Sequence, residues 1–221
     1  MNVFLSGQKY FGLETLKMLI AEDDVNVVGI SAPQGEDRLY KRAWQLEIPI
    51  INAGCLNADT LPGGVDVIVC AHSHDFISDV MLRKTVLGGI GYHPSLLPLR
   101  RGRDAVYWSI AYGDKVTGGS VYWLNSHVDG GPIAAQDWCF IRPNDNPFEL
   151  WTRDLQPMGI RLFRRVMSEL KAGVITAEPQ DNSLSTWEPS VGRPPLFRPD
   201  LLRIGPAPEG YEYKRGMKGE N

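Results

Sequence analysis

Residues 1–30, MNVFLSGQKYFGLETLKMLIAEDDVNVVGI, predict a strand, a helix and a second strand. Residues 2–5 are an apolar run that stops at Ser6, and residues 12–22 carry apolar side chains at helical spacing. Residues 25–30 form another β-like run. A strand–helix–strand unit of ~30 residues is typical of a parallel sheet covered by helices.

The same alternation continues toward the middle of the chain. Two helix-capable stretches and three β-like runs follow: helices at 35–46 and 77–87, strands at 48–51, 65–70 and 88–92. The run VDVIVC (65–70) has the apolar character of a strand that is buried on both faces. The pattern predicts an α/β, Rossmann-like fold with a mostly parallel sheet and helices on both faces.

In the next part of the chain the spacing of apolar residues changes from helical to strand-like. Residues 103–113 have helical spacing, and two strand-like runs, 116–124 and 133–141, then flank a glycine-rich turn. Pro147 suits the first turn of a helix, so we expect a long helix from this residue to near Gly173.

The composition changes again near the C-terminus. From Asp181 the chain is rich in Pro, Ser, Arg and Gly, which favours irregular structure. We therefore expect one globular domain, residues 1–180, and an irregular C-terminal extension, residues 181–221. Trp187 and Phe197 are the expected apolar anchors of this extension.

Length and composition favour one soluble domain. The 221 residues are 43% hydrophobic and 22% charged, which is enough for one sizeable core. Three widely spaced cysteines, Cys55, Cys70 and Cys139, show no disulfide or zinc pattern and are expected to be reduced thiols. The N-terminus lacks a signal-peptide pattern, and no window approaches the ~18 apolar residues of a membrane span. A cytoplasmic location is expected.

Two polar groups stand out against this scaffold. His93 opens the string HPSLLP (93–98) directly after a β-like run, and two prolines stiffen the backbone there. Asp129 opens the glycine-rich turn DGGPI (129–133) between two later strands. A titratable imidazole and a distant carboxylate suit acid/base chemistry near neutral pH.

The surrounding strings are more specific than the pair. HPSLLPLRRGRDAVYWSI (93–110) and VTGGSVYWLNSHVDGGPIAAQ (116–136) resemble the folate-dependent formyltransferase family, over roughly residues 1–180. With GQKYFG (7–12) and the tyrosine before His93, the pattern is most similar to the hydrolase domain of 10-formyltetrahydrofolate dehydrogenase. The resemblance implies a formyltransferase-type fold and an enzyme that transfers a formyl group from 10-formyltetrahydrofolate.

By this resemblance His93 and Asp129 are the catalytic pair. Formyl transfer to an amine passes through a tetrahedral intermediate whose oxygen gains negative charge, and the amine must lose a proton. His93 is implied to donate to that oxygen and Asp129 to handle the proton. The alternatives are a structural histidine and an aspartate that only forms the turn.

The resemblance also implies two binding regions. The walls of the folate pocket are expected to be Phe76, Ile77, Leu97 and Val128. The contacts to the substrate that accepts the formyl group are expected to be Ser6, Gly7, Gln8, Lys9 and Arg101. Arg101 lies in the basic stretch RRGR (100–103), which suits an anionic acceptor or the glutamate tail of folate; a solvated loop is the alternative.

One position departs from the family pattern. Most formyltransferases have an asparagine two residues before the histidine, where this chain has Gly91. Loss of one oxyanion donor typically lowers the rate ~10²–10³-fold, so a water or another side chain is expected to stand in. Hydrolysis of 10-formyltetrahydrofolate and a non-catalytic folate-binding role are the alternatives to amine formylation.

No metal site is predicted. Cys70, His72 and His74 alternate, so on a strand they would share one face, as metal ligands can. No fourth ligand stands at regular spacing, and formyl transfer needs no metal. Histidines that line a pocket or face solvent are the preferred interpretation.

The expected partner is a small-molecule amine, without nucleic acid or membrane, and the sequence predicts no oligomeric state. The net charge of −3 argues against nucleic acid, because phosphate binding needs a basic surface. The residues after Gly173 are too few for the extra barrel domain of tRNA-formylating enzymes. Core packing or folate-pocket lining is expected for the aromatic set Tyr107, Trp108, Tyr112, Tyr122 and Trp123.

Overall fold

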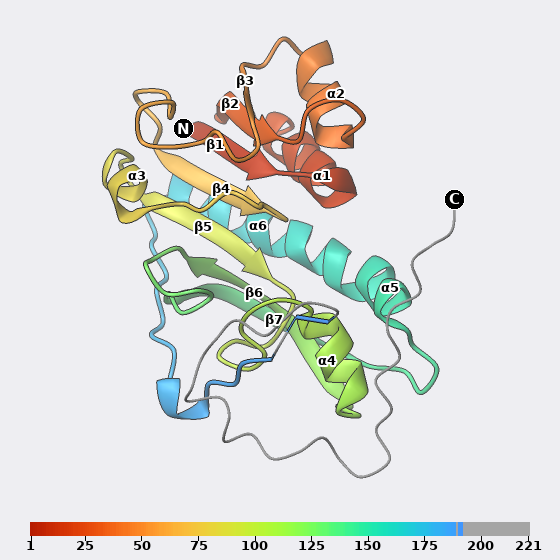
Figure 1. Ribbon diagram of the computed structural model, residues 1–221. Helices are drawn as coiled ribbons and strands as arrows, with labels where there is room; N and C mark the ends of the chain where they lie inside the picture. The colour runs from red at the N-terminus through yellow and green to blue at the C-terminus, as the bar shows by residue number, and fades with distance from the viewer. Residues whose placement is uncertain (189, 192–221) are drawn as a thin grey trace.

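The fold is built around one mostly parallel sheet. The computed structural model describes residues 1–188, 190 and 191, and its seven strands lie in the order β3-β2-β1-β4-β5-β6-β7 (Figure 1). The strands are β1 (Asn2–Gly7), β2 (Asn26–Ala32), β3 (Ile50–Asn52), β4 (Val67–Ala71), β5 (Gly88–His93), β6 (Val116–Trp123) and β7 (Ile133–Phe140). Strands β1 to β5 are parallel, and β6 runs antiparallel to both β5 and β7. The predicted Rossmann-like fold is confirmed.

Helices connect the strands at the predicted places. They are α1 (Lys9–Ile20), α2 (Arg38–Gln45), α3 (Asp79–Arg83), α4 (Ala105–Ala111), α5 (Pro147–Leu150), the π-helical turn η1 (Trp151–Leu155), α6 (Gln156–Lys171) and the 3₁₀ turn η2 (Asn182–Leu184). Helix α5 begins with a capping box, in which Asn146 and Glu149 bond reciprocally ahead of the first turn and Pro147 follows the cap.

The helix predicted over 77–87 is shorter than expected. Helix α3 ends at Arg83, and the backbone N–H groups of Val86 and Leu87 donate to the carbonyls of Val65 and Asp66 instead. These bonds to the residues before β4 draw the chain out of the helix and into β5. Local spacing could not reveal this competition, because the partners lie about twenty residues away.

The long helix predicted from Pro147 is interrupted by η1. Pro157 stands in the first turn of α6 and has no N–H to donate to the carbonyl of Arg153. A π-helical turn at Trp151–Leu155 accommodates the missing bond, so that α5, η1 and α6 follow one another without a loop.

Both faces of the sheet are buried. Leu5 of β1 packs in one core cluster with Phe163 of α6, whereas its neighbour Phe4 packs in a second cluster with Met81 of α3. Helices α1, α2 and α6 cover the first face, and α6 is seen crossing behind β4 and β5 in Figure 1. Helix α3 and the segment 53–66 cover the second face. The prediction of helices on both faces is confirmed.

The described part of the C-terminal extension lies against the domain. Trp187 is buried and forms an isolated bridge with Arg101. Phe197, the other expected anchor, lies outside the described residues. The boundary at residue 180 stays a prediction.

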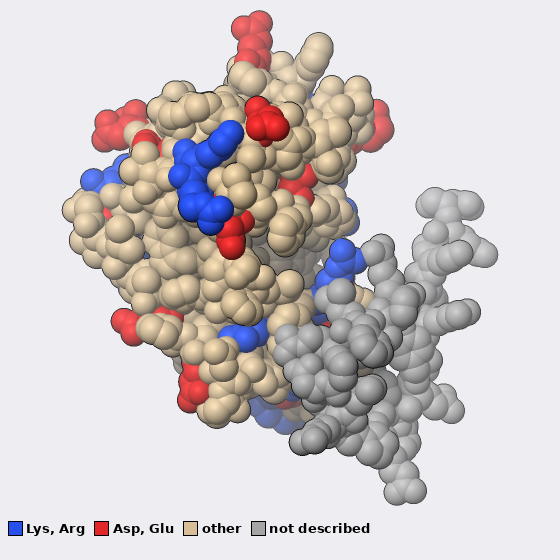
Figure 2. Space-filling model, turned by 60° about the vertical axis from the view of Figure 1, so that its left-hand side comes forward, with Lys and Arg blue, Asp and Glu red and all other residues tan. Residues whose placement is uncertain are grey.

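The distribution of surface charge and the lengths of the helices are relevant to nucleic-acid and membrane binding. Figure 2 shows acidic and basic side chains interspersed over one face, with no continuous basic stripe among the described residues there. Within that same part of the chain, no helix has the length and apolar character needed to cross a membrane.

Candidate active site

His93 ends β5 and its side chain is held by the loop that follows. The side chain is only 8% exposed, and Nε2 lies 2.7 Å from the carbonyl oxygen of Arg100. Because a carbonyl only accepts, Nε2 carries the hydrogen of this bond. Nδ1 is therefore the ring nitrogen left to act on another group, and it faces Asp129.

Asp129 meets His93 from the loop between β6 and β7. Its Oδ2 atom lies 3.6 Å from Nδ1 of His93, and its side chain is 12% exposed. The residue adopts the left-handed region, φ 50°, which aspartate tolerates better than most residues. The backbone N–H of Gly102 donates to Oδ2 at 2.8 Å. The structure thus brings together two groups that are 36 positions apart in the sequence.

Tyr122, for which the sequence predicts only core packing or pocket lining, completes this arrangement. The hydroxyl of Tyr122, on β6, donates to Oδ1 of Asp129 at 2.7 Å. Burial first, and then the negative charge of Asp129, raise the pKa of the Tyr122 phenol well above its ordinary value. The phenol therefore stays protonated and remains a donor. Its position depends on strand register, which local sequence does not fix.

The segment after α6 secures the Asp129 turn. The amide Nε2 of Gln180 donates to the carbonyls of Asp129 and Gly131, at 2.8 and 2.6 Å. The same side chain accepts, through Oε1, from the guanidinium of Arg101 at 2.6 Å. The backbone of the turn is thereby tied to the loop that follows His93.

Arg101, which is expected to bind the substrate, contacts the C-terminal segment. Its guanidinium is buried and also donates to Oδ1 of Asn182 at 2.9 Å. A buried guanidinium that donates to two amides of its own chain holds the C-terminal segment, and its contact with a substrate stays a prediction. The basic stretch RRGR gives no local sign of these bonds, because their partners Gln180 and Asn182 follow about eighty residues later.

The neighbouring Arg100 reinforces the same loop. Its guanidinium pairs with Glu188 at 2.7 Å and Asp114 at 3.0 Å and lies over the ring of Tyr112. Burial alone would lower the pKa of Arg100, but the hydrogen bonds with Asp114 and Glu188 raise it above its ordinary value. The carbonyl that accepts from His93 therefore belongs to a residue fixed by two ion pairs.

The loop 6–9, expected to contact the acceptor, is bonded to its own chain. Ser6 is buried and its hydroxyl donates to Asp75 at 2.6 Å; Gln8 is buried and donates to the carbonyl of His72 at 3.0 Å. At Gly7, an added Cβ would lie 2.6 Å from the carbonyl oxygen of Ala71, so glycine permits the close approach of β1 and β4. The side chains of Ser6 and Gln8 hold the strand ends together, and the acceptor contacts expected in this loop stay predictions.

Lys9 shows where this loop departs from a phosphate-binding turn. Its backbone N–H donates to Oδ2 of Asp37 at 2.6 Å, while Oδ1 of Asp37 caps α2 through Leu39. In Rossmann-like folds this turn after β1 commonly binds phosphate through backbone N–H groups. Here a carboxylate of the chain occupies that position.

The four expected walls of the folate pocket lie in different surroundings. Ile77 is buried in the core cluster of Phe4 and Met81, and Leu97 is also buried. Phe76 and Val128 are 76% and 52% exposed, on the loops after β4 and before Asp129. Ile77 packs in the core where the chain turns inward to begin α3, and all four folate contacts stay predictions.

The alternation of Cys70, His72 and His74 does not continue as a strand. Strand β4 ends at Ala71, and His72 adopts a left-handed φ of 62°. Burial, and then Asp75, raise the pKa of the Cys70 thiol to about 12, so this thiol stays protonated. Among the described residues, no group of three or more metal-ligating side chains is present.

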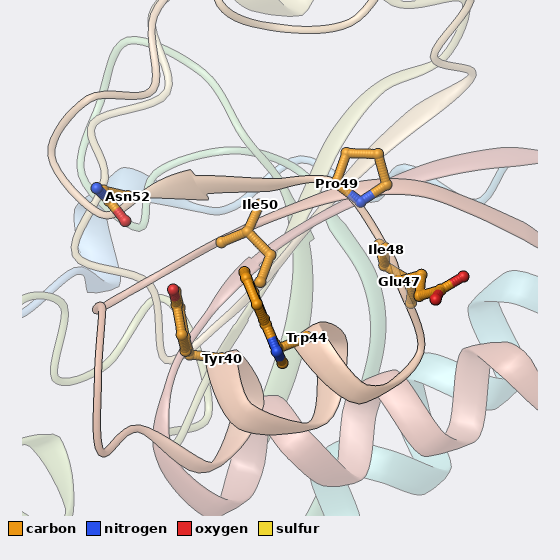
Figure 3. Close-up of a pocket in the computed structure, with 7 residues that line it drawn as sticks. All are labelled: Tyr40, Trp44, Glu47, Ile48, Pro49, Ile50 and Asn52. Carbon is orange, nitrogen blue, oxygen red and sulfur yellow. The ribbon is translucent and has the colours of Figure 1, made fainter.

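An open groove lies elsewhere on the sheet. Its volume is about 450 Å³, and it is lined from α2 to β3 by Tyr40, Trp44, Glu47, Ile48, Pro49, Ile50 and Asn52 (Figure 3). Strands β2, β1 and β4 separate β3 from β5. The groove therefore does not belong to the His93–Asp129 site.

Fold and site together define an α/β domain with a buried His–Asp pair at the carboxyl end of a parallel strand. The chain belongs to the formyl transferase family, whose model matches residues 56–166, about half of its length. The resemblance found in the sequence is confirmed.

Two curated relatives match most of this chain. Over 204 residues, 85% of its length, the chain is 29% identical to the mitochondrial 10-formyltetrahydrofolate dehydrogenase of Mus musculus, but it spans only 22% of that protein. It is 30% identical to the methionyl-tRNA formyltransferase of Roseiflexus castenholzii over 86% of this chain and 65% of that protein.

Solved structures share the fold. The phosphoribosylglycinamide formyltransferase from Bacillus halodurans matches 77% of this chain and 95% of its own, with a TM-score of 0.66 and 22% identity. A 4-N formyltransferase from Francisella tularensis matches 85% of this chain and 75% of its own, with a TM-score of 0.70 and 19% identity. An N-formyltransferase from Helicobacter canadensis, crystallised with folinic acid and dTDP-3-aminofucose, covers 84% of this chain and 70% of its own, with a TM-score of 0.69 and 15% identity.

Proposed function

We propose that this chain transfers the formyl group of 10-formyltetrahydrofolate to the amine of a small molecule, with His93 and Asp129 as the catalytic pair. The observation that carries the proposal is the 3.6 Å approach of His93 Nδ1 to Asp129 Oδ2 in a member of the formyl transferase family. Related proteins support the donor, since the dehydrogenase relative carries 10-formyltetrahydrofolate in its name and a structural neighbour was crystallised with folinic acid.

The reaction needs one hydrogen-bond donor and one proton acceptor at the formyl carbon. The amine nitrogen attacks this carbon, and the carbonyl oxygen becomes an oxyanion. His93, with Nε2 committed to Arg100, donates from Nδ1 in its protonated form. Asp129 accepts the proton that the amine loses, the bond to N10 breaks, and this proton passes to N10, which leaves Asp129 ionised again. The products are an N-formyl amine and tetrahydrofolate.

The surroundings of the pair favour this chemistry. Side chains that are 8% and 12% exposed interact more strongly with a developing charge than exposed side chains do. Because their partners are fixed before substrate binds, little reorganisation accompanies the reaction. Phe76, Ile77, Leu97 and Val128 remain the expected folate contacts, of which Phe76 and Val128 are exposed.

Hydrolysis of 10-formyltetrahydrofolate is the second candidate, and one observation favours it. Asp37 occupies the turn at Lys9 that would otherwise receive the phosphate of a nucleotide-linked acceptor. Water in place of the amine would release formate and tetrahydrofolate through the same intermediate. In the transferase case, the same contact favours an acceptor whose recognition does not depend on phosphate at that turn.

Purified protein mixed with 10-formyltetrahydrofolate distinguishes these functions. We expect tetrahydrofolate to appear only when a suitable amine is added; formate release without any amine would support the hydrolase instead. His93→Ala is expected to abolish turnover in either case while leaving the circular dichroism spectrum unchanged, because it removes the donor and His93 belongs to neither hydrophobic core cluster. Full activity of this variant would contradict the assigned role, and folate binding without turnover by the wild-type protein would contradict catalysis altogether.

A further inference from the structure

Tyr122 and Gly91 face each other across two strands at the centre of the site. They are direct cross-strand partners in the antiparallel pairing of β6 with β5. Residues paired in this way lie side by side on one face of the sheet. Tyr122 is buried, and its hydroxyl reaches Asp129 from this position.

Gly91 leaves the space that the Tyr122 ring uses. An added Cβ at Gly91 would lie 3.3 Å from both Cε1 and the hydroxyl oxygen of Tyr122, and 3.1 Å from Cδ2 of Leu124. These separations are tighter than ordinary van der Waals contact, so any larger residue at position 91 would press on the phenol. Tyr122 can therefore place its hydroxyl on Asp129 only because position 91 has no side chain.

The Tyr122 hydroxyl fixes the rotation of the Asp129 carboxylate. Oδ1 accepts from Tyr122 at 2.7 Å while Oδ2 accepts from the N–H of Gly102 at 2.8 Å. With one donor on each oxygen, the carboxylate plane is set, and Oδ2 is the oxygen that faces His93. Without the hydroxyl, Oδ1 would lose this donor, and the carboxylate would rotate more freely about its terminal torsion, which is intrinsically broad.

We propose that Tyr122 is a positioning residue that holds the Asp129 carboxylate against His93, and that Gly91 is required to admit its ring. The inference rests on the proposed function and deepens it by naming the group that orients the proton acceptor. Tyr122 acts through Asp129 and is assigned no contact with the reacting atoms.

Tyr122→Phe tests this role, with Tyr92→Phe as the matched control. Tyr92 is partly buried, and its hydroxyl donates to the carbonyl of Leu155 at 2.6 Å, a different partner from the catalytic pair. We expect Y122F to lower kcat ~10–100-fold, the range for losing a hydrogen bond to a charged group, with KM for 10-formyltetrahydrofolate changed less than about twofold. Y92F should leave kcat within about threefold of wild type. Equal kcat in Y122F and wild type, or equal losses in Y122F and Y92F, would overturn the proposal.

A measurement independent of turnover separates failure of this inference from failure of the proposed function. The ring resonances of His93, assigned by their loss in H93A, should move in the NMR spectrum of Y122F and stay in place in Y92F, because only Y122F releases the facing carboxylate. Unmoved resonances in Y122F would overturn the positioning role even in an active enzyme. If the wild-type protein turns over no folate while the resonances move, Tyr122 still orients Asp129 and the proposed function alone is wrong.

Discussion

At the scale of single residues, hydrogen-bond partners decide which atoms can react. Nε2 of His93 donates to the carbonyl of Arg100, and each carboxylate oxygen of Asp129 accepts one hydrogen bond. The strings HPSLLP and DGGPI were enough to select these two residues from the sequence. Tyr122 could not be selected in this way, because strand register decides that it lies beside Gly91 and within reach of Asp129. The phenol of Tyr122 fills the space beside Gly91 but bonds to Asp129, so the group that replaces the missing oxyanion donor stays a prediction.

Gly91→Ala is expected to lower kcat by up to about tenfold, because the added Cβ displaces the Tyr122 ring by a few tenths of an ångström. The same substitution should cost less in Y122F than in wild type, since the displaced hydroxyl is already gone. Steady-state kinetics of the two single variants and the double variant measure this. Gly63→Ala is the control, because nothing lies within 4 Å of its added Cβ. Fully independent effects of G91A and Y122F would contradict a shared space.

At the scale of elements, competition between local spacing and distant bonds sets where helices end. Helix α3 stops early because Val86 and Leu87 donate to the residues before β4, and Pro157 forces the π-helical turn between α5 and α6. An ion pair supports that turn from outside. Arg153, within η1, donates to Asp145 in the preceding loop at 2.7 Å.

This ion pair predicts a pH-dependent stability. The hydrogen bond from Arg153, with that from the Arg142 backbone, lowers the pKa of Asp145 from 3.8 to about 2. A lowered pKa means that the carboxylate stabilises the fold fully above pH 3.8 and that this stabilisation is lost as the pH falls toward 2. Asp145→Asn should therefore unfold at a lower temperature than wild type at pH 7, and the gap should close between pH 4 and 2. Thermal melts across this range test it.

Asp59→Asn provides the comparison for that series, because the side chain of Asp59 is exposed. Its melting temperature should follow wild type at every pH. A gap for D145N that persists unchanged at pH 2 would show that the ion pair does not account for the stability difference.

At the scale of the whole molecule, the segment after α6 joins the two halves of the site. It pairs with β7 at Glu178, holds the Asp129 turn through Gln180, and reaches the His93 loop through Thr186 and Glu188. Composition predicted an irregular extension from residue 181 and gave no sign of these contacts. The part of the extension that the structure describes is therefore a component of the site scaffold.

Gln180→Ala should lower both stability and activity. It removes the donor to two backbone carbonyls and the acceptor for Arg101, so we expect a loss of about 1–3 kcal/mol, or roughly 2–10 °C in Tm. The Asp129 turn loses its support, and kcat should fall with it. Differential scanning calorimetry and steady-state kinetics measure the two effects. Gln34→Ala, at an exposed position, should change neither, and an unchanged Tm in Q180A would contradict a scaffolding role.

The sequence by itself determined the order of strands and helices, the parallel sheet, the family and the two candidate catalytic residues. Apolar periodicity and the strings around His93 and Asp129 are local features, which is why they could be recognised without coordinates. Only the tertiary structure decided which side chains meet. Tyr122 reaches Asp129 through strand register, Arg101 is buried under a segment about eighty residues away, and Asp37 closes the turn at Lys9. Contacts between distant segments depend on how the elements pack, so they cannot be predicted from the spacing of residues along the chain.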